Sequence, residues 1–294
     1  MCLLRSPPSD SLPDIDWSKY AYVLSAHNVV YLCNAVMAFE SLHQLGSQAD
    51  KVLLYPSDFD SEDKSIEGRL LRKAQTEYNV NLMPIREQDQ QHGVVSWEES
   101  YTKLLAFNLT QYNRVLTRQE MDELFLLEDS PIAMPRAYWL GSSLRPRTSS
   151  LVLIQPSETE FSRVSAAVQH FARADGEAEV LNSLYGETAI VLPHRPYIVC
   201  TEEFRSTNHA AYLGSRHATW DPESVLQEAR YVKYSDSQVA KPWLKTPRKV
   251  FEKAQPACSV DTTASTLDCR ARDLWLGFYT EFAERRKRIC GSDL

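Results

Sequence analysis

Short apolar runs alternate along this chain with stretches in which apolar residues recur every three or four positions. The runs at residues 20–25, 51–55 and 80–85 predict buried strands. Between them, residues 31–45 and 64–78 have the spacing of amphipathic helices. Strands that alternate with helices of this length predict a mostly parallel sheet that helices cover on both faces.

The second half of the chain continues this alternation less regularly. Residues 96–111 show helical spacing, and residues 112–116 predict the start of a buried strand. The further elements that we expect are a strand that ends before residue 139, a strand at 150–155, a helix that Ser157 opens with Glu160 completing a capping box, a helix at 177–185, a strand at 189–192, a loop-rich region at 200–222 and a last helix at 270–290.

These patterns predict a single α/β domain with short additions at its two ends. We expect a leader at residues 1–17, the α/β domain at residues 18–250 and a helical tail at residues 251–294. With 43% apolar residues, a chain of 294 residues can form one large core or a core with a small appendage. The cations at residues 285–288 crowd the end of the last helix, where they suit the helix macrodipole better than they indicate a membrane patch.

The charge balance excludes some classes of partner. A net charge of −7 and a pI near 5.6 argue against a nucleic-acid-binding surface, which needs a basic face. No run of about 18 apolar residues occurs, so we expect no transmembrane segment. The apolar stretch at the N-terminus is also too short for the core of a signal peptide.

The six cysteines do not include a C-x-x-C pair, so a zinc site is not expected. Cys33 falls among apolar residues, and we expect it to be a buried thiol of the core. Cys258, Cys269 and Cys290 cluster in the tail and would be able to pair in an oxidising compartment. A glycosylation sequence at residues 108–110 falls inside a predicted helix.

Four segments carry a family resemblance: TKLLAFNLTQYNRVL, MDELF, AMPRAYW and LIQPS. They resemble the fungal branch of the family-8 glycosyltransferases, which contains glycogenin and the fungal N-acetylglucosaminyltransferases. The resemblance extends over residues 17–243. It implies a GT-A-like nucleotide-sugar fold and retaining transfer of a hexosyl group, GlcNAc or glucose, from a UDP-sugar donor to a glycan or protein acceptor. It also implies a Golgi location, although the lack of an anchor or signal leaves a cytoplasmic location open.

The resemblance breaks where the family binds its metal. In family members, the strand that corresponds to residues 112–116 continues into an L-D-x-D element, whose aspartates hold Mn²⁺ or Mg²⁺ against the UDP diphosphate. Here Leu116 is followed by Thr117-Arg118-Gln119-Glu120 and then directly by MDELF. Lys233 occupies the position of the family's histidine ligand, which precedes the segment Lys241-Pro242-Trp243. The family therefore implies a divalent cation, but we expect no metal ligands in this chain.

Two other acidic segments have a weaker claim to bind metal. Asp58-Phe59-Asp60 has the D-x-D spelling, but the surrounding SDFDSEDKS is typical of a solvated turn. Asp122 and Glu123 follow the break after Leu116, and we expect them to cap the turn that they open.

Ligands bind open parallel sheets at the carboxyl ends of the strands, where the strand order reverses. Ser25 ends the first strand, and His27, Asn28 and Tyr31 follow it, so these four residues are candidates for nucleotide-sugar binding. Asn28 can offer a donor and an acceptor to a base edge, and Tyr31 can stack on the base. The resemblance agrees, because the corresponding Asn and Tyr hold the uracil and ribose in glycogenin-like enzymes; His27 departs from the small hydroxyl residue that is usual there. The alternative is a turn asparagine followed by a core tyrosine.

Three further residues are candidates through the resemblance. Lys103 and Lys241 match family lysines that reach the nucleotide-sugar and the diphosphate, and an ammonium is a point charge suited to phosphate. The alternative for each lysine is a solvated face. Glu177 corresponds to a family aspartate on the short helix and is a weak catalytic candidate, because it keeps the charge but changes its reach.

Three functional hypotheses remain open. In the first, the chain belongs to a working hexosyltransferase lineage, and the break after Leu116 is a faulty exon join. In the second, it is a pseudoenzyme that keeps a nucleotide-sugar pocket for binding or regulation, which the added loss of the histidine ligand favours. The third, an accessory protein with an unrelated activity, has no supporting motif, since a nucleophile elbow, a P-loop and a dinucleotide glycine fingerprint are all missing from the sequence.

Overall fold

A computed structural model of the protein describes residues 15–85, 99–117, 121–140, 146–171, 176–261, 266–292 and 294. Most of the leader that we expect at residues 1–17 lies outside these ranges. Residues 118–120, which belong to the break after Leu116, also lie outside them.

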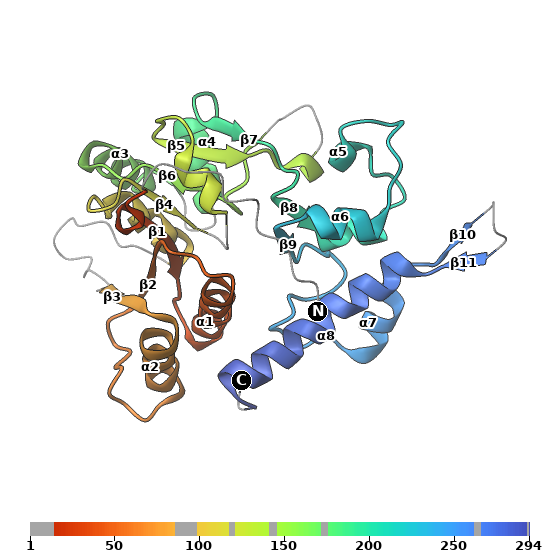
Figure 1. The fold of residues 1–294 in the computed structure, drawn as a ribbon, viewed down its shortest axis with the longest axis horizontal. Coiled ribbons are helices and arrows are strands. Elements are labelled where there is room, and N and C mark those ends of the chain that lie inside the picture. The colour runs from red at the N-terminus through yellow and green to blue at the C-terminus, as the bar shows by residue number, and fades with distance from the viewer. Residues whose placement is uncertain are drawn as a thin grey trace.

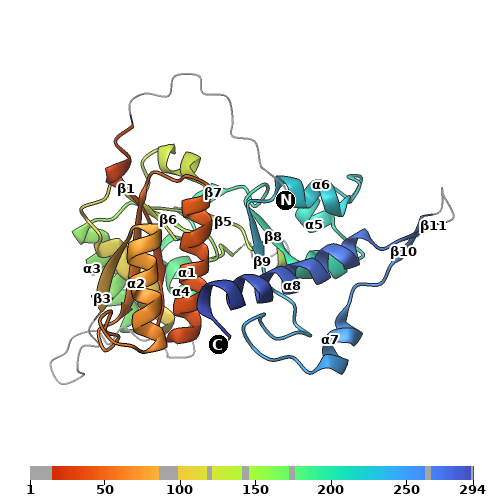
Figure 2. The ribbon, with the colours of Figure 1, turned by 60° about the horizontal axis from the view of Figure 1, so that its bottom comes forward.

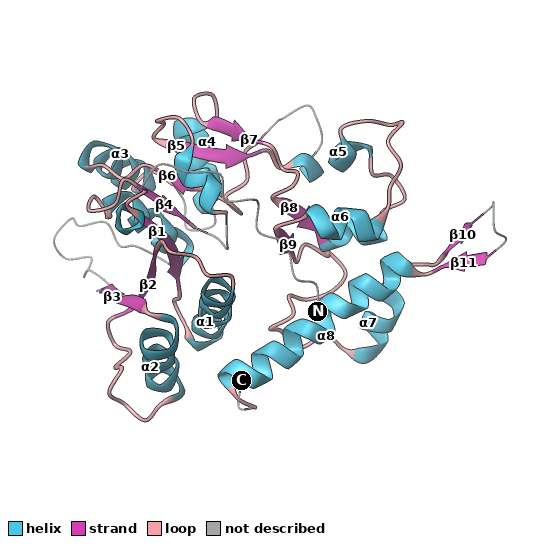
Figure 3. Cartoon of the chain, viewed as in Figure 1, coloured by secondary structure: helices cyan, strands magenta, loops and turns pink. Residues whose placement is uncertain are grey.

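The fold is built on a sheet of seven strands in the order β3-β2-β1-β4-β6-β5-β7 (Figures 1 and 3). β6 is antiparallel to β4 and β5, and the other pairings are parallel, so the prediction of a mostly parallel sheet is confirmed. The strands are β1 (Tyr20–Ser25), β2 (Asp50–Pro56), β3 (Val80–Ile85), β4 (Arg114–Leu116), β5 (Ile132–Pro135), β6 (Leu153–Ile154) and β7 (Ile190–Leu192).

β1 lies where the order of the strands reverses. On one side it pairs with β2, with Ser25 opposite Leu54. On the other side it pairs with β4, with Tyr22 opposite Leu116. The carboxyl ends of β1 and β4 therefore mark the position at which open parallel sheets bind their ligands.

Helices cover both faces of this sheet, as predicted. Tyr22 points to one face, while Ala21 and Val23 point to the other, because side chains alternate along a strand. On the Tyr22 side lie α1 (Val29–Gln44) and α2 (Ile66–Tyr78); on the opposite side lie the 3-10 helix η3 (Glu99–Asn108), α3 (Glu158–Val168) and α4 (Glu177–Tyr185).

Two local predictions on the opposite side need correction. The helix that we expect to reach residue 111 is the 3-10 helix η3, which ends at Asn108. Asn108 is therefore the exposed last residue of the helix and does not lie in its interior. The capping box of α3 is half formed. Ser157 Oγ accepts the backbone N–H of Glu160 at 3.1 Å, but the Glu160 carboxylate accepts the hydroxyl of Tyr185 at 2.5 Å. A tertiary hydrogen bond thus replaces the local one.

A second, smaller unit follows β7, in which long loops join short helices over residues 200–222, as expected (Figure 1). Its own apolar cluster surrounds a parallel pair of strands, β8 and β9. The elements of this unit are β8 (Ile198–Cys200), the 3-10 helix η6 (Thr201–Arg205), α5 (Ala210–Leu213), α6 (Pro222–Glu228), β9 (Tyr231–Lys233) and α7 (Arg248–Ala254). Two further 3-10 helices, η4 (Asp122–Leu126) and η5 (Tyr138–Leu140), precede it in the chain.

A buried carboxylate holds this unit to the C-terminal helix α8 (Arg270–Cys290). The side chain of Asp236 accepts the indole N–H of Trp275 at 3.2 Å and the hydroxyl of Tyr279 at 2.9 Å, both from α8. From η6, it accepts the hydroxyl of Thr201 and a guanidinium N–H of Arg205 at 3.3 Å. Donors from two elements thus converge on Asp236, which offsets the cost of burying its charge.

α8 runs from the small unit to α1, as Figures 1 and 2 show. A disulfide between Cys33 of α1 and Cys290 of α8 closes a sequence separation of 257 residues. The expectation that Cys33 is a free core thiol is therefore wrong. α8 has 21 residues, but none of the helices in the described ranges is long and apolar enough to cross a membrane.

The cations at the end of α8 bind α1. Their role is therefore more than the favourable interaction with the macrodipole of α8 that the sequence predicts. Glu40 of α1 is 3% exposed, and its carboxylate accepts from Arg285 at 3.1 Å and from Arg288 at 3.2 Å. Arg285 also donates to the backbone oxygen of Met37 at 2.9 Å. Burial alone would raise the pKa of Glu40, but the hydrogen bonds from Arg288 and Arg285 outweigh it and hold that pKa below its ordinary value.

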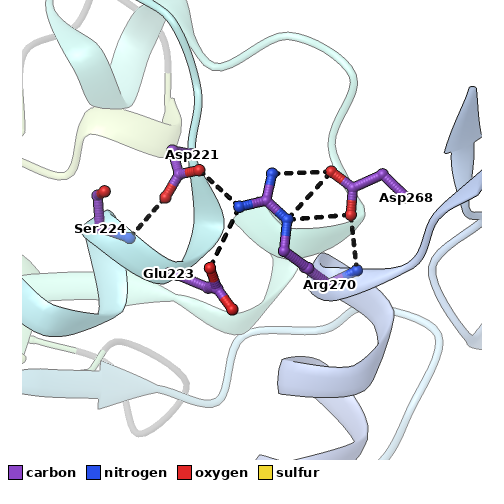
Figure 4. A network of polar contacts seen from close by, with 5 residues as sticks. All are labelled: Asp221, Glu223, Ser224, Asp268 and Arg270. Atoms are coloured by element: carbon purple, nitrogen blue, oxygen red, sulfur yellow. Dashed lines mark hydrogen bonds and ion pairs between the residues drawn. The ribbon is translucent and has the colours of Figure 1, made fainter. Parts of the chain in front are cut away.

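At the other end of α8, a hairpin of β10 (Ser259–Asp261) and β11 (Thr266–Asp268) projects from the body (Figure 1). A disulfide between Cys258 and Cys269 closes its base, so two of the tail cysteines pair as expected. Arg270 joins this base to α6 by donating to Asp268 and Asp221, each at 2.8 Å (Figure 4). These side chains are partly exposed, so the network orients the hairpin more than it stabilises the fold.

We predict that Glu40→Gln lowers the free energy of unfolding by about 2 kcal/mol, because it removes the charge that two arginines bind. The difference should be constant above the ordinary glutamate pKa of about 4.3 and should shrink as the pH falls through the lowered pKa of the folded state. Urea unfolding of both proteins between pH 7 and pH 3 measures it. The exposed Glu284→Gln, on α8, is the control and should change stability little. A difference that does not vary with pH would contradict the ionic contact.

Candidate functional site

The predicted residues after β1 lie at the reversal of strand order. Ser25 is the last residue of β1, and the backbone N–H of Ala26 still donates to Leu54 O at 2.9 Å. Asn28 begins α1, and its side-chain oxygen accepts the backbone N–H groups of Val30 at 3.0 Å and Tyr31 at 3.2 Å. This oxygen caps the helix, so the amide nitrogen of Asn28 is the group best placed to face a ligand.

Four aromatic rings from three parts of the chain form what we call the aromatic corner: His27, Tyr31, Trp243 and Phe282. The ring of Tyr31 lies 4.1 Å from that of His27 and 5.9 Å from that of Trp243, between centroids. Trp243 in turn lies 6.0 Å from Phe282 of α8. Tyr31 is 37% exposed, so it is not the fully buried core residue of the alternative interpretation. The structure thus brings the end of β1 next to the segment that contains Lys241.

Lys241 lies beside this corner. Its ammonium donates to the backbone oxygen of Tyr234, whose ring packs edge-on against Phe282 at 5.6 Å. In the described part of the chain, no carboxylate forms an ion pair with Lys241. A cation whose hydrogen-bond partner in these ranges is neutral keeps its charge available for an anionic ligand.

Lys103 and Glu177, which the sequence places 74 positions apart, form a second group. The Lys103 ammonium donates to the carboxylate of Glu177 and to the backbone oxygen of Ser149 at 3.3 Å. The two side chains are 18% and 19% exposed. The pairing brings together two of the residues predicted separately, and it gives Glu177 a countercharge.

The described residues do not offer the ligands of a divalent cation. No group of three or more His, Cys, Asp and Glu side chains in these ranges is arranged to hold a metal ion. Asp60 accepts the backbone N–H of Glu62 at 2.8 Å within a turn, as the solvated-turn interpretation predicts. The ammonium of Lys233 lies 3.8 Å from the ring centre of Trp139, a cation–π contact. Glu120, in the break after Leu116, lies outside the described residues.

The expected role of Asp122 as a cap is wrong. Its carboxylate accepts the hydroxyl of Tyr22 at 2.5 Å and that of Ser47 at 3.2 Å, and it makes no cap hydrogen bond in η4. The Tyr22 hydroxyl also accepts the backbone N–H of Met121 at 2.8 Å. These hydrogen bonds hold the MDELF segment to β1, on the face of the sheet that α1 covers.

The sequence did not predict the aromatic partners of the site. Trp243 was visible next to Lys241, and Phe282 was visible on one face of the last helix, but nothing local indicated that they meet Tyr31. A second aromatic group was not predicted either. His194, which follows β7, stacks on Tyr138 with 4.6 Å between ring centres, and a ring nitrogen of His194 lies 2.6 Å from Tyr212 O. Burial lowers the pKa of His194.

Comparison with curated proteins places the chain in a family. It is 44% identical over 292 residues to glucose N-acetyltransferase 1 of Gibberella zeae, an alignment that covers 95% of this chain and 64% of the relative. It is 39% identical over 300 residues to glucose N-acetyltransferase 1 of Aspergillus fumigatus, covering 94% of this chain and 78% of the relative. The chain belongs to the glucose N-acetyltransferase 1 family. It spans less than two thirds of the length of the first of these relatives.

Solved structures show which fold this family member has. The apo form of the glycosyltransferase GlyE of Streptococcus pneumoniae matches with a TM-score of 0.52 and 15% identity, over 92% of this chain and 63% of that one. The bifunctional glycosyltransferase WbbM matches with a TM-score of 0.54 and 12% identity, over 94% and 50%. No protein-family model matches the chain. The prediction of a GT-A-like glycosyltransferase fold is confirmed.

We predict that Lys103 and Glu177 contribute to stability as a pair. A double-mutant cycle with Lys103→Met and Glu177→Gln should give a coupling free energy of about 1–3 kcal/mol, because both groups are mostly buried. The control is the pair of Lys73 and Glu77, whose atoms lie 3.1 Å apart on the surface of α2. Its coupling should stay below about 0.5 kcal/mol. Equal coupling in both cycles would mean that burial does not strengthen the first pair.

Proposed function

We propose that the protein binds a UDP-sugar at the carboxyl ends of β1 and β4, and that its reaction is retaining transfer of GlcNAc or glucose to a glycan or protein acceptor. The observation that carries the proposal is the aromatic corner, which sets Tyr31 and Trp243 beside Lys241 at the reversal of strand order. The names of the relatives and the glycosyltransferase fold support the same class of chemistry.

Each side chain suits a part of such a donor. The rings of Tyr31 and Trp243 offer faces to the uracil and ribose, and the amide of Asn28 offers a donor to the base. Lys241 supplies a positive charge for the diphosphate, whose negative charge grows as the bond to the sugar breaks. We assign the orientation of the sugar to Lys103 and Glu177, which are held as a pair.

The family resemblance implies Mn²⁺ or Mg²⁺, but the described residues do not fit either ion. Hard divalent cations need several oxygen ligands, and no suitable group of acidic side chains is found in these ranges. We therefore propose no step through a metal, and assign the neutralisation of the diphosphate to side-chain cations.

A second candidate is a pseudoenzyme that binds a nucleotide-sugar without turning it over. It is favoured by Lys233, which occupies the position of the family's histidine ligand and lies against Trp139. A charged lysine cannot ligate a cation, and the ammonium of Lys233 instead contacts the indole of Trp139. Such a protein would still bind the nucleotide-sugar but would not transfer the sugar.

The disulfides support a compartment for this function. Four of the described cysteines form two bonds, Cys33–Cys290 and Cys258–Cys269. Disulfides persist in oxidising compartments and are rare in the cytosol. This favours the Golgi lumen, which the resemblance implies, over a cytoplasmic location.

Turnover separates the two candidates. The purified chain is incubated with radiolabelled UDP-GlcNAc or UDP-glucose and a mixture of glycan acceptors, with and without Mn²⁺. Release of UDP with label in the glycan supports the transferase, and UDP binding without transfer supports the pseudoenzyme. Sequencing the transcript across the codons of Leu116 and Thr117 then shows whether the missing L-D-x-D segment is absent from the gene product.

We predict that Lys241→Ala weakens UDP binding about tenfold, since one charge-assisted contact contributes about 1.4 kcal/mol or more. Calorimetric titration measures the affinity. Lys245→Ala removes the same charge from an exposed position four residues away and should change it by less than about twofold. For the wild type, replacing Mn²⁺ by EDTA should leave the affinity unchanged, because the described residues include no group of side chains that could hold the ion. Equal affinity of wild type and Lys241→Ala would refute the phosphate assignment.

A further inference from the structure

Arg286 differs from the other arginines at the end of α8. It is 8% exposed, and its Nη1 donates to the side-chain oxygen of Asn34 at 3.2 Å. Arg285 and Arg288 share the carboxylate of Glu40, but in the described ranges Arg286 has no carboxylate partner. Burial accordingly lowers the pKa of Arg286. A buried guanidinium with one neutral partner is costly to the fold, unless something else supplies the countercharge.

This guanidinium lies next to the aromatic corner. Asn34, its partner, is one helical turn along α1 from Tyr31. On α8, Phe282 is one turn before Arg286. Phe282 and Tyr31 are both in contact with Trp243, at 6.0 Å and 5.9 Å between ring centres. Two of the segments that form the corner, α1 and α8, therefore also hold Arg286.

Lys241 belongs to the third segment of the aromatic corner. Its ammonium is bound to Tyr234 O, and the ring of Tyr234 packs on Phe282 at 5.6 Å. Two cations without carboxylate partners among the described residues thus flank one aromatic surface. An anionic ligand at the aromatic corner would supply the countercharge that both cations lack in these ranges.

We propose that Arg286 and Lys241 form an anion subsite that binds the diphosphate of the nucleotide-sugar. The planar guanidinium can bind two phosphate oxygens at once, while the ammonium acts as a point charge on the same group. This proposal rests on the proposed function, since it assigns a further residue, from the C-terminal helix, to the same ligand. The subsite supplies positive charge in a site where the described residues hold no metal ligands.

Calorimetric titration of the full chain with UDP, uridine and inorganic pyrophosphate tests the subsite. Arg286→Gln should weaken UDP binding about tenfold, which corresponds to about 1.4 kcal/mol, and should leave the affinity for uridine unchanged. Arg286→Lys should retain part of the UDP affinity and alter the ³¹P chemical shifts of bound UDP. Lys287→Gln is the matched control, because it removes the same charge from an exposed neighbour on α8. Thermal unfolding of each variant establishes that it is folded.

The outcomes distinguish the subsite from the proposed function. If the wild type binds UDP, and Arg286→Gln binds it as well as Lys287→Gln does, the subsite is wrong and the nucleotide pocket stands. If Arg286→Gln loses uridine and UDP affinity equally, Arg286 has only a structural role and the subsite is again wrong. If the wild type binds pyrophosphate but not uridine, the subsite is a phosphate site and the nucleotide assignment fails. A wild type that binds none of the three refutes both proposals.

Discussion

The contact between the first and the last helix is the constraint on which the rest of the structure depends. Glu40 of α1 is almost fully buried, and it is stable there only because Arg285 and Arg288 bring their charges to it. The disulfide from Cys33 to Cys290 fixes the same two helices covalently. Because α8 also carries Trp275 and Tyr279, which bind Asp236, this contact holds the small unit against the main sheet.

The candidate site is a consequence of that docking. Tyr31 at the start of α1 and Phe282 on α8 meet Trp243 between them, so the aromatic corner exists only when the chain's two ends are joined. The tail is therefore part of the site and not an appendage to it. A helix that is locked by a disulfide and by buried charges also gives rigid walls, which lowers the entropic cost of ordering a ligand.

The charges near the site fit a consistent chemistry. Nucleotide-sugars carry a diphosphate, and an environment that binds it needs positive charge from a metal or from side chains. In the described part of the chain the acidic ligands of a metal are not grouped, whereas Lys241 and Arg286 have only neutral partners. Lys233, held against Trp139, adds a cation in the small unit. Phosphate recognition by side chains is thus the common feature of both functional candidates.

The sequence by itself determined the local elements. The apolar runs and helical spacings gave β1, β3, α4 and α8 with the observed bounds, because these patterns depend only on which face of each element is buried. The tertiary structure decided the partners. Cys33 with Cys290, Glu40 with Arg288 and Tyr31 with Trp243 are each more than 200 positions apart, and periodicity carries no information about which distant faces meet. The site was predicted as separate residues at strand ends and lysine motifs, and only packing brought them together.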